Sequence, residues 1–201
     1  MSTPAPTPAA VPARARYTRD ELLEVVVRVF NERGYEATSM GDLARAAGLT
    51  KSSFYHHVSG KEQLLRLAVG RALDALEAAL DAAEATPGRP VDRLEQVVRR
   101  TAEVLLAELP HVTLLLRLRG NTEAEREALE RRRAVDARVA ALVAAAVGAG
   151  EVRGDLDPRL VTRLVFGMVN SLSEWARPGE RGGAAVHAVV ELALDGLRAA
   201  R

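Results

Sequence analysis

Residues 38–61, with the sequence TSMGDLARAAGLTKSSFYHHVSGK, constrain the fold more than any other part of the chain. Apolar side chains recur from Met40 to Ala47 at the i, i+3, i+4, i+7 spacing of a short amphipathic helix. Gly48 follows them, and glycine often ends a helix because it adopts a left-handed backbone without steric strain. Thr50 is a suitable N-cap for a second short helix. Two short helices around a glycine turn predict a helix-turn-helix motif.

The second of these helices is rich in hydrogen-bond donors and carries no acidic residue. Such side chains contact the phosphates and base edges of DNA. The only lysines of the chain, Lys51 and Lys61, fall in this helix and just after it, although chance placement in an arginine-rich chain remains an alternative. A local DNA site is compatible with the formal net charge of +1, because the placement of charge matters more than its sum. The residues expected to contact DNA are Ser39, Thr50, Lys51, Ser52, Ser53, Tyr55, His56, His57 and Lys61.

Three parts of this segment resemble the TetR family of bacterial transcription regulators: AAGLT at 46–50, FYHHV at 54–58, and Lys61. The chain departs from the family pattern at Gly41, where a charged or polar residue is common, and at Val58, which replaces a commoner phenylalanine. The resemblance implies a homodimeric, all-helical repressor with an N-terminal DNA-binding domain and a C-terminal domain that binds a small effector. The expected operator is pseudo-palindromic, since two-fold symmetry in the protein is mirrored in its DNA site.

The family motif also implies a division of roles within the expected DNA interface. Phe54 is expected to belong to the core. The residues expected to anchor phosphates are Thr50, Tyr55, His57 and Lys61, and those expected nearest to the base edges are Lys51, Ser52, Ser53 and His56.

The chain divides into three segments. Residues 1–13 carry four prolines and no charged side chain, and are expected to form a disordered tail rich in proline and alanine. A helix-turn-helix domain is expected over 14–60, where Arg14 and Arg16 either touch phosphate or the minor groove or form a solvated lead-in. A helical effector-binding and dimerisation domain is expected over 61–201.

Helical periodicity runs through both domains, and no segment has the pattern of a strand, so we predict an all-α fold of about nine helices. Thr18 and Ser59 each begin a capping-box sequence, and Pro110 is expected to mark a helix boundary. A long helix through Glu84 should join the domains as a lever. The expected helices are 18–33, 39–47, 50–58, 59–84, 91–108, 112–118, 122–147, 157–175 and 186–197.

Two sites are expected in the C-terminal domain by position alone. An effector pocket needs apolar walls with a few polar groups, although each candidate residue is equally compatible with a plain core role. The pocket candidates are Leu114, Leu118, Phe166, Met168, Asn170 and Trp175. The last two helices carry an apolar stripe that suits either a dimer interface or packing within one subunit. The interface candidates are Leu164, Leu172, Val186, Val189, Val190, Ala193, Leu194 and Leu197.

An arginine cluster leaves two interpretations open. Arginines 117, 119, 126 and 131–133 either form a solvated face paired with glutamates 123, 125, 127 and 130, or bind a phosphate-bearing effector such as an acyl-coenzyme A. Residues 150–153, 155–158 and 167–170 look similar to family members that sense acyl-coenzyme A thioesters.

Other functional classes find little support in the sequence. Cysteine is absent, His56 and His57 are adjacent and point to different helix faces, and we expect no metal, no cofactor and no enzymatic activity. His111 and His187 are lone histidines, expected to be structural or surface residues. No apolar run approaches the roughly 20 residues of a membrane span, and we expect a cytoplasmic protein. A ligand-independent DNA-binding protein of the same fold, such as a nucleoid-organising or division-blocking factor, remains the alternative.

Overall fold

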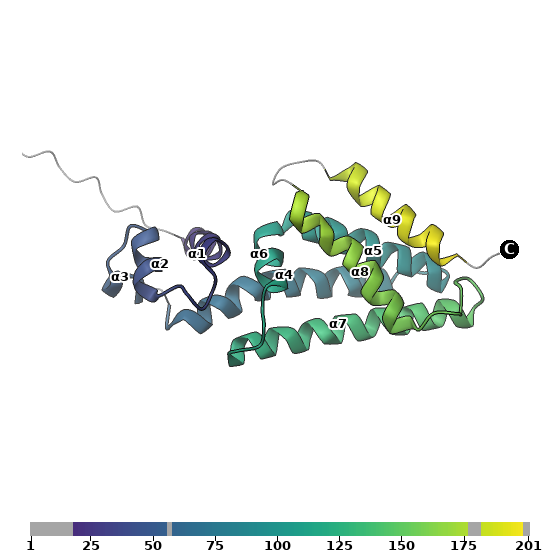
Figure 1. Ribbon diagram of the computed structural model, residues 1–201, viewed down its shortest axis with the longest axis horizontal. Helices are drawn as coiled ribbons and strands as arrows, with labels where there is room; N and C mark the ends of the chain where they lie inside the picture. Colours follow the sequence, from purple (N-terminus) through teal and green to yellow (C-terminus); the bar gives the residue numbers. More distant parts are fainter. Residues whose placement is uncertain (1–17, 56–57, 177–181, 199–201) are drawn as a thin grey trace, which may run out of the picture.

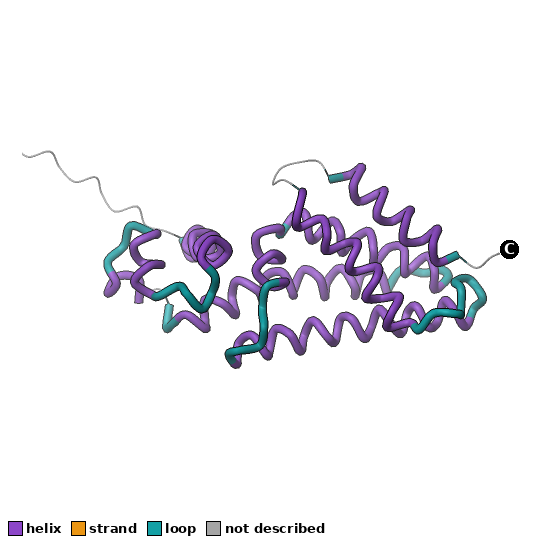
Figure 2. Tube along the Cα trace, viewed as in Figure 1, coloured by secondary structure: helices purple, strands orange, loops and turns teal. Residues whose placement is uncertain are grey.

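The computed structural model describes residues 18–55, 58–176 and 182–198. Within these ranges the chain forms nine α-helices and only an isolated β-bridge between Val152 and Arg198, which confirms the all-α prediction (Figures 1 and 2). The predicted tail, with Arg14 and Arg16, lies outside the described residues. The helices are α1 (Arg19–Arg33), α2 (Met40–Ala46), α3 (Lys51–Tyr55), α4 (Lys61–Glu84), α5 (Pro90–Ala107), α6 (Leu109–Leu116), α7 (Glu123–Gly148), α8 (Pro158–Trp175) and α9 (Gly183–Leu197).

Side chains that cap backbone N–H groups set where several helices begin. Capping boxes start α1 at Thr18, α2 at Ser39 and α7 at Thr122. The box predicted at Ser59 is absent, because the backbone and hydroxyl of Ser59 donate to the Gln63 side chain at 2.7 and 2.9 Å. The first helical residue of α4 is therefore Lys61.

The helix boundary predicted at Pro110 is present, because α5 ends at Ala107 and α6 begins at Leu109, but the second helix begins earlier than expected. Pro110 lies in the first turn of α6, where the N–H that proline lacks has no helical partner in any case. Helix α6 therefore spans 109–116 instead of the expected 112–118.

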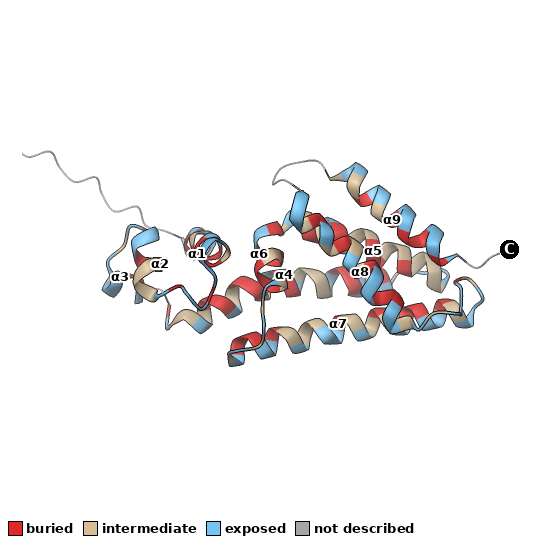
Figure 3. Ribbon diagram, viewed as in Figure 1, coloured by how far each residue is buried: buried red, intermediate tan, exposed pale blue. Residues whose placement is uncertain are grey.

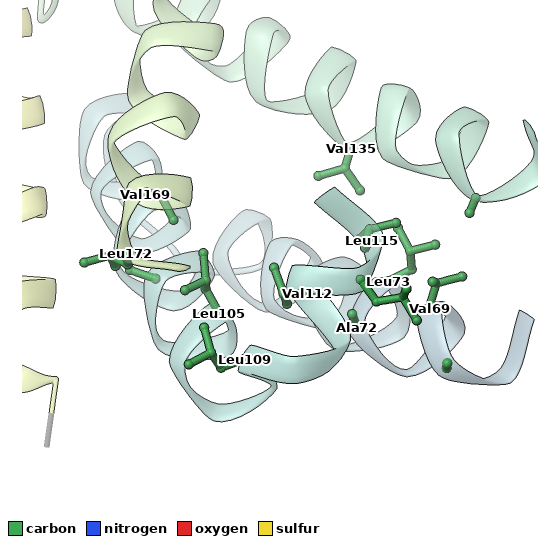
Figure 4. Packing of buried hydrophobic residues seen from close by; sticks show 14 of the residues in the cluster. Val69, Ala72, Leu73, Leu105, Leu109, Val112, Leu115, Val135, Val169 and Leu172 are labelled. Carbon is green, nitrogen blue, oxygen red and sulfur yellow. The ribbon is translucent and has the colours of Figure 1, made fainter. Parts of the chain in front are cut away.

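Helices α1–α3 form a small unit at one end of the elongated molecule, and α4 extends from it into the larger helical unit (Figure 1). Helix α4 contacts α1, α5, α6 and α7. The larger unit is held together by buried aliphatic side chains, including Leu73 of α4, Val112 and Leu115 of α6 and Val135 of α7 (Figure 4). Helix α9 covers α5 and α8 from outside. None of the helices in the described ranges is long and apolar enough to cross a membrane.

A ladder of ion pairs fastens α4 to α7. Arg131 of α7 binds Asp74 at 2.6 Å and Glu77 at 2.7 Å. One heptad further along both helices, Arg138 binds its own two carboxylates, those of Asp81 and Glu84, each at 2.6 Å. Arg66 and Glu127 form a further pair at 2.8 Å. A single exposed ion pair stabilises a protein little, but a network of repeated pairs fixes the register of α7 against α4.

Candidate DNA interface, effector cavity and subunit face

Helix α3 presents the polar surface that the sequence predicted. Lys51, Ser52 and Tyr55 are exposed, while Phe54 has no exposed surface, which confirms that it belongs to the core. The Thr50 hydroxyl accepts a hydrogen bond from the backbone N–H of Ser53 at 3.2 Å and so begins the helix. Ser53 is partly exposed, and His56 and His57 lie outside the described residues.

Ser39 lies at the start of α2 and has a structural role there. Its hydroxyl donates to the Asp42 carboxylate at 2.6 Å and accepts from the Asp42 backbone N–H at 3.2 Å. These hydrogen bonds hold the pKa of Asp42 below its ordinary value. Ser39 is also exposed, so a DNA contact by this residue stays a prediction.

The structure gives Lys61 contacts within the chain at the position where the sequence predicted a phosphate contact. Its ammonium donates to the backbone carbonyl oxygens of Tyr35, Glu36 and Thr38 at 3.0, 3.3 and 3.1 Å. The same nitrogen lies 4.4 Å from the centroid of the Tyr35 ring. An ammonium has three donors, and these carbonyls take all three, so none is left for a phosphate. Lys61 instead pins the α1–α2 loop to the start of α4.

A second set of contacts joins the DNA-binding unit to α6. The buried His111 of α6 forms hydrogen bonds through Nδ1 with the carbonyl oxygen of Ala68 at 2.9 Å and through Nε2 with Glu24 of α1 at 3.2 Å. The Asn31 amide donates to the carbonyl oxygen of Pro110 at 2.8 Å, and Arg117 donates to that of Asn31 at 2.7 Å. The structural role expected for His111 is confirmed. Its partners lie 43 and 87 residues away in the sequence, which is why no local pattern revealed them.

A partly open cavity of about 40 Å³ lies between α4, α5, α6, α7 and α8. Of the predicted pocket residues, Phe166 and Asn170 line it. The other four do not: Leu114 is buried core, Leu118 and Met168 pack against the core elsewhere, and Trp175 is 57% exposed. The residues that line the cavity are Leu73, Leu76, Thr101, Leu105, Val112, Leu115, Leu116, Arg132, Val135, Asp136, Phe166 and Asn170.

The predicted arginine cluster is dispersed. Arg131 is bound to carboxylates of α4, and Arg117 and Arg126 donate to backbone carbonyls. Only Arg132 reaches the cavity. Among the described residues, no arginine of the cluster forms an ion pair with a glutamate of α7, and Arg117 and Arg131 instead bind groups far away in the sequence. The solvated face paired with those glutamates is therefore wrong, and recognition of a phosphate-bearing effector stays a prediction.

Asp136 is the acidic residue on the cavity wall, and its burial raises the pKa of its carboxyl group above the ordinary value. The positive charges of Arg132 on α7 and Arg163 on α8 oppose this shift but are the smaller effects. The side chains that α4, α5 and α6 bring to the cavity are uncharged. A raised pKa in the folded state means that the native protein binds this proton more tightly than the unfolded chain does.

This shift predicts a pH dependence of stability. The proton contributes stability that is fully present below the unfolded pKa of about 3.9 and is lost as the pH rises through the higher folded pKa. The Asp136→Asn variant does not titrate at this position. The melting temperature of the wild-type protein should therefore fall relative to that of the variant between about pH 4 and pH 7. Thermal unfolding of both proteins across this range measures the difference. A difference that stays constant, or that favours the wild type as the pH rises, would contradict the assignment.

The predicted interface stripe is mostly buried inside the chain, and this prediction needs correction. Residues without exposed surface in one chain have none left to bury against another. Leu164 remains 56% exposed and Val189 partly exposed. The residues that pack within the chain, each 7% exposed or less, are Leu172, Val186, Val190, Ala193, Leu194 and Leu197.

The opposite faces of the last two helices carry a different apolar surface, which we call the outer stripe. It follows helical spacing on both helices and combines large apolar residues with small ones that allow close approach. On α8 the outer stripe consists of Leu160, Leu164, Gly167, Ser171 and Trp175, and on α9 of Ala185, Ala188, Val189, Leu192 and Gly196, all exposed or partly exposed. Figure 3 shows α9 with a buried inner face and exposed residues along its outside. The four large members Leu160, Leu164, Trp175 and Leu192 are between 45% and 69% exposed.

An exposed polar helix in a helix-turn-helix, joined by one long helix to a helical unit with a partly open cavity, defines a DNA-binding regulator. Comparison with known proteins narrows the class. The model described as "Bacterial regulatory proteins, tetR family" matches residues 22–68, and the model "Tetracyclin repressor-like, C-terminal domain" matches residues 87–197. The chain belongs to the TetR family of bacterial regulatory proteins.

Individual relatives agree with this assignment. SCO3833 from Streptomyces coelicolor A3, described as a TetR-family transcriptional regulator, has a TM-score of 0.84 and 57% identity over 93% of this chain and 94% of its own. The transcriptional repressor KstR2 of Mycolicibacterium smegmatis is 28% identical over 84% of this chain and 83% of its own length. The structure of AibR in complex with isovaleryl coenzyme A and operator DNA has a TM-score of 0.74 and 26% identity, over 87% and 96% of the two chains.

Proposed function

We propose that the protein is a transcriptional repressor that binds a pseudo-palindromic operator as a homodimer and is released by a small effector. The observation that carries the proposal is the path of α4, which begins at Lys61 beside the helix-turn-helix and brings Leu73 and Leu76 to the cavity wall. The outer stripe supplies an apolar surface for the second subunit. The protein would act in the cytoplasm, where bacterial DNA lies, and without catalysing a reaction.

The release mechanism follows from how the cavity is built. Helix α4 has 24 residues and is therefore about 36 Å long. Helix α6 also lines the cavity and is fastened to α1 through His111. A ligand that spreads α4 and α6 would change the separation of the two α3 helices, which must match successive major-groove faces about 34 Å apart.

We propose an apolar compound, such as the acyl part of an acyl-coenzyme A thioester, as the effector. The apolar walls of the cavity support this class, and the AibR structure contains isovaleryl coenzyme A. One observation favours the alternative of a ligand-independent DNA-binding protein. The cavity of about 40 Å³ has room for only a few water molecules, at roughly 10–15 Å³ of probe volume for each, so a larger effector requires the helices to move.

Selection of bound fragments from a random DNA library, followed by footprinting, tests the DNA-binding part. We expect an inverted repeat whose half-sites lie about one helical turn, or a multiple of it, apart. The expected stoichiometry is one dimer or a whole number of dimers per site. A protected site without inverted symmetry, bound by single subunits at every concentration, would refute the proposal.

The effector part is tested separately by reciprocal coupling. A ligand that weakens operator binding must itself bind more weakly, by the same factor, when operator is present. Titrating a ligand found by thermal-shift screening, with and without operator DNA, measures both factors. Equal ligand affinity in the two titrations would favour the ligand-independent alternative.

A further inference from the structure

Four polar side chains converge on the otherwise apolar cavity: Thr101 of α5, Arg132 and Asp136 of α7, and Asn170 of α8. Within the part of the chain that the structure describes, none of these side chains makes a hydrogen bond to another protein group. Polar groups in protein interiors are almost always paired, with water or a ligand where no protein partner exists. All four residues are partly exposed, and none of their polar atoms is buried without a partner, so water can satisfy them. The cavity therefore has a polar end at which a ligand with matching hydrogen-bonding groups can replace water.

The charges at this end restrict what the occupant can be. Asp136 is partly buried, and the nearby positive charges of Arg132 and Arg163 act on it, but neither arginine forms an ion pair with it among the described residues. The cavity wall carries one charge of each sign, so a cationic group placed here would meet the Arg132 guanidinium, and an anionic group would meet the Asp136 carboxylate. A neutral hydroxyl meets neither penalty, because it donates to the carboxylate and accepts from a neighbouring donor.

This inference rests on the proposed function. We propose that the effector is a hydroxyl-bearing member of the apolar class, whose hydroxyl donates a hydrogen bond to the Asp136 carboxylate and accepts one from the Asn170 amide. The apolar body would contact the aliphatic and aromatic wall formed by Leu73, Leu115 and Phe166. Asp136 would then determine specificity, since an apolar ligand without the hydroxyl leaves the carboxylate unpaired.

The experiment uses four probes that share a six-membered ring: cyclohexanol, cyclohexylamine, cyclohexanecarboxylate and methylcyclohexane. Methyl NMR of the full-length protein follows Leu73, Val112, Leu115 and Val135, whose methyl groups line the cavity. Cyclohexanol should bind about tenfold more tightly than each of the other three, because a hydrogen bond to a charged group favours binding by about that factor or more.

Three variants assign the preference to one carboxylate. The Asp136→Leu variant should show no preference for cyclohexanol and should bind methylcyclohexane at least as tightly as the wild-type protein does. Asp136→Asn keeps an acceptor without the charge and should retain a weaker preference. Glu130→Leu removes an exposed carboxylate from the same helix and should behave as the wild type.

Each other outcome overturns the inference in a recognisable way. Equal binding of all four probes by the wild type would show that the cavity takes ligands but does not select a hydroxyl, which leaves the proposed function intact. An unchanged preference for cyclohexanol in Asp136→Leu would remove Asp136 from the site. If no probe shifts the cavity methyl signals, the inference and the effector part of the proposed function both fail, while operator binding stands on its own experiment.

Discussion

The double substitution Leu164→Glu and Leu192→Glu is expected to convert the protein into a monomer and to weaken operator binding by roughly a hundredfold or more. Both residues are exposed in the isolated chain, at 56% and 69%, so the charges cost little in the monomer. In a dimer that buries the outer stripe, the same charges lie unpaired between apolar surfaces. A monomer reads only one half-site and loses the contribution of the other.

Light scattering and operator titration measure the two effects. Trp175 is the only tryptophan and belongs to the outer stripe, so its emission should move to longer wavelength when the subunits separate. Ala144→Glu places the same charge on an exposed position of α7 and should leave both measurements unchanged. A double variant that stays dimeric would show that the subunits associate elsewhere.

The outer stripe shows what sequence periodicity could and could not provide. The spacing of Val186, Val190 and Leu194 correctly indicated an apolar helix face, and the structure contains a helix there. Periodicity does not reveal which neighbour covers a helix face. Helix α9 has an apolar inner face, and its outer face also carries apolar residues such as Leu192. Tertiary packing decides whether an apolar face lies at a subunit interface or in the chain's own core. In this chain the face with more apolar residues packs in the core.

The same dependence on tertiary packing explains why the sequence predicted the helix-turn-helix more completely than the residues of the cavity. The helix-turn-helix was predictable because its determinants lie within one segment of about two turns on either side of Gly48. The cavity takes its walls from five helices, and residues such as Leu73 and Thr101 have no local feature that distinguishes them from core residues. Asp136 follows a run of three arginines in the sequence, a pattern typical of an exposed charged face, although its neighbour Val135 is buried.

Lys61→Met should destabilise the DNA-binding unit and weaken operator binding without changing the salt dependence of that binding. The methionine keeps the length of the side chain but leaves three carbonyl oxygens, those of Tyr35, Glu36 and Thr38, without their donor. The loss of these charge-assisted hydrogen bonds should lower the free energy of unfolding by about 2 kcal/mol. A residue that contacts phosphate would instead lower the slope of log K against log salt by about one unit when it is removed.

Lys51 is the matched control, since it is the other lysine of the chain and is exposed on α3. Lys51→Met should reduce the salt slope by about one unit or change the preferred bases, with little effect on the melting temperature. Lys61→Gln retains N–H donors and should recover part of the stability that Lys61→Met loses, because the carbonyls accept from a neutral amide as well. If Lys61→Met lowers the salt slope as Lys51→Met does and leaves the melting temperature unchanged, Lys61 binds DNA in the complex and its contacts to the α1–α2 loop exist only in the free protein.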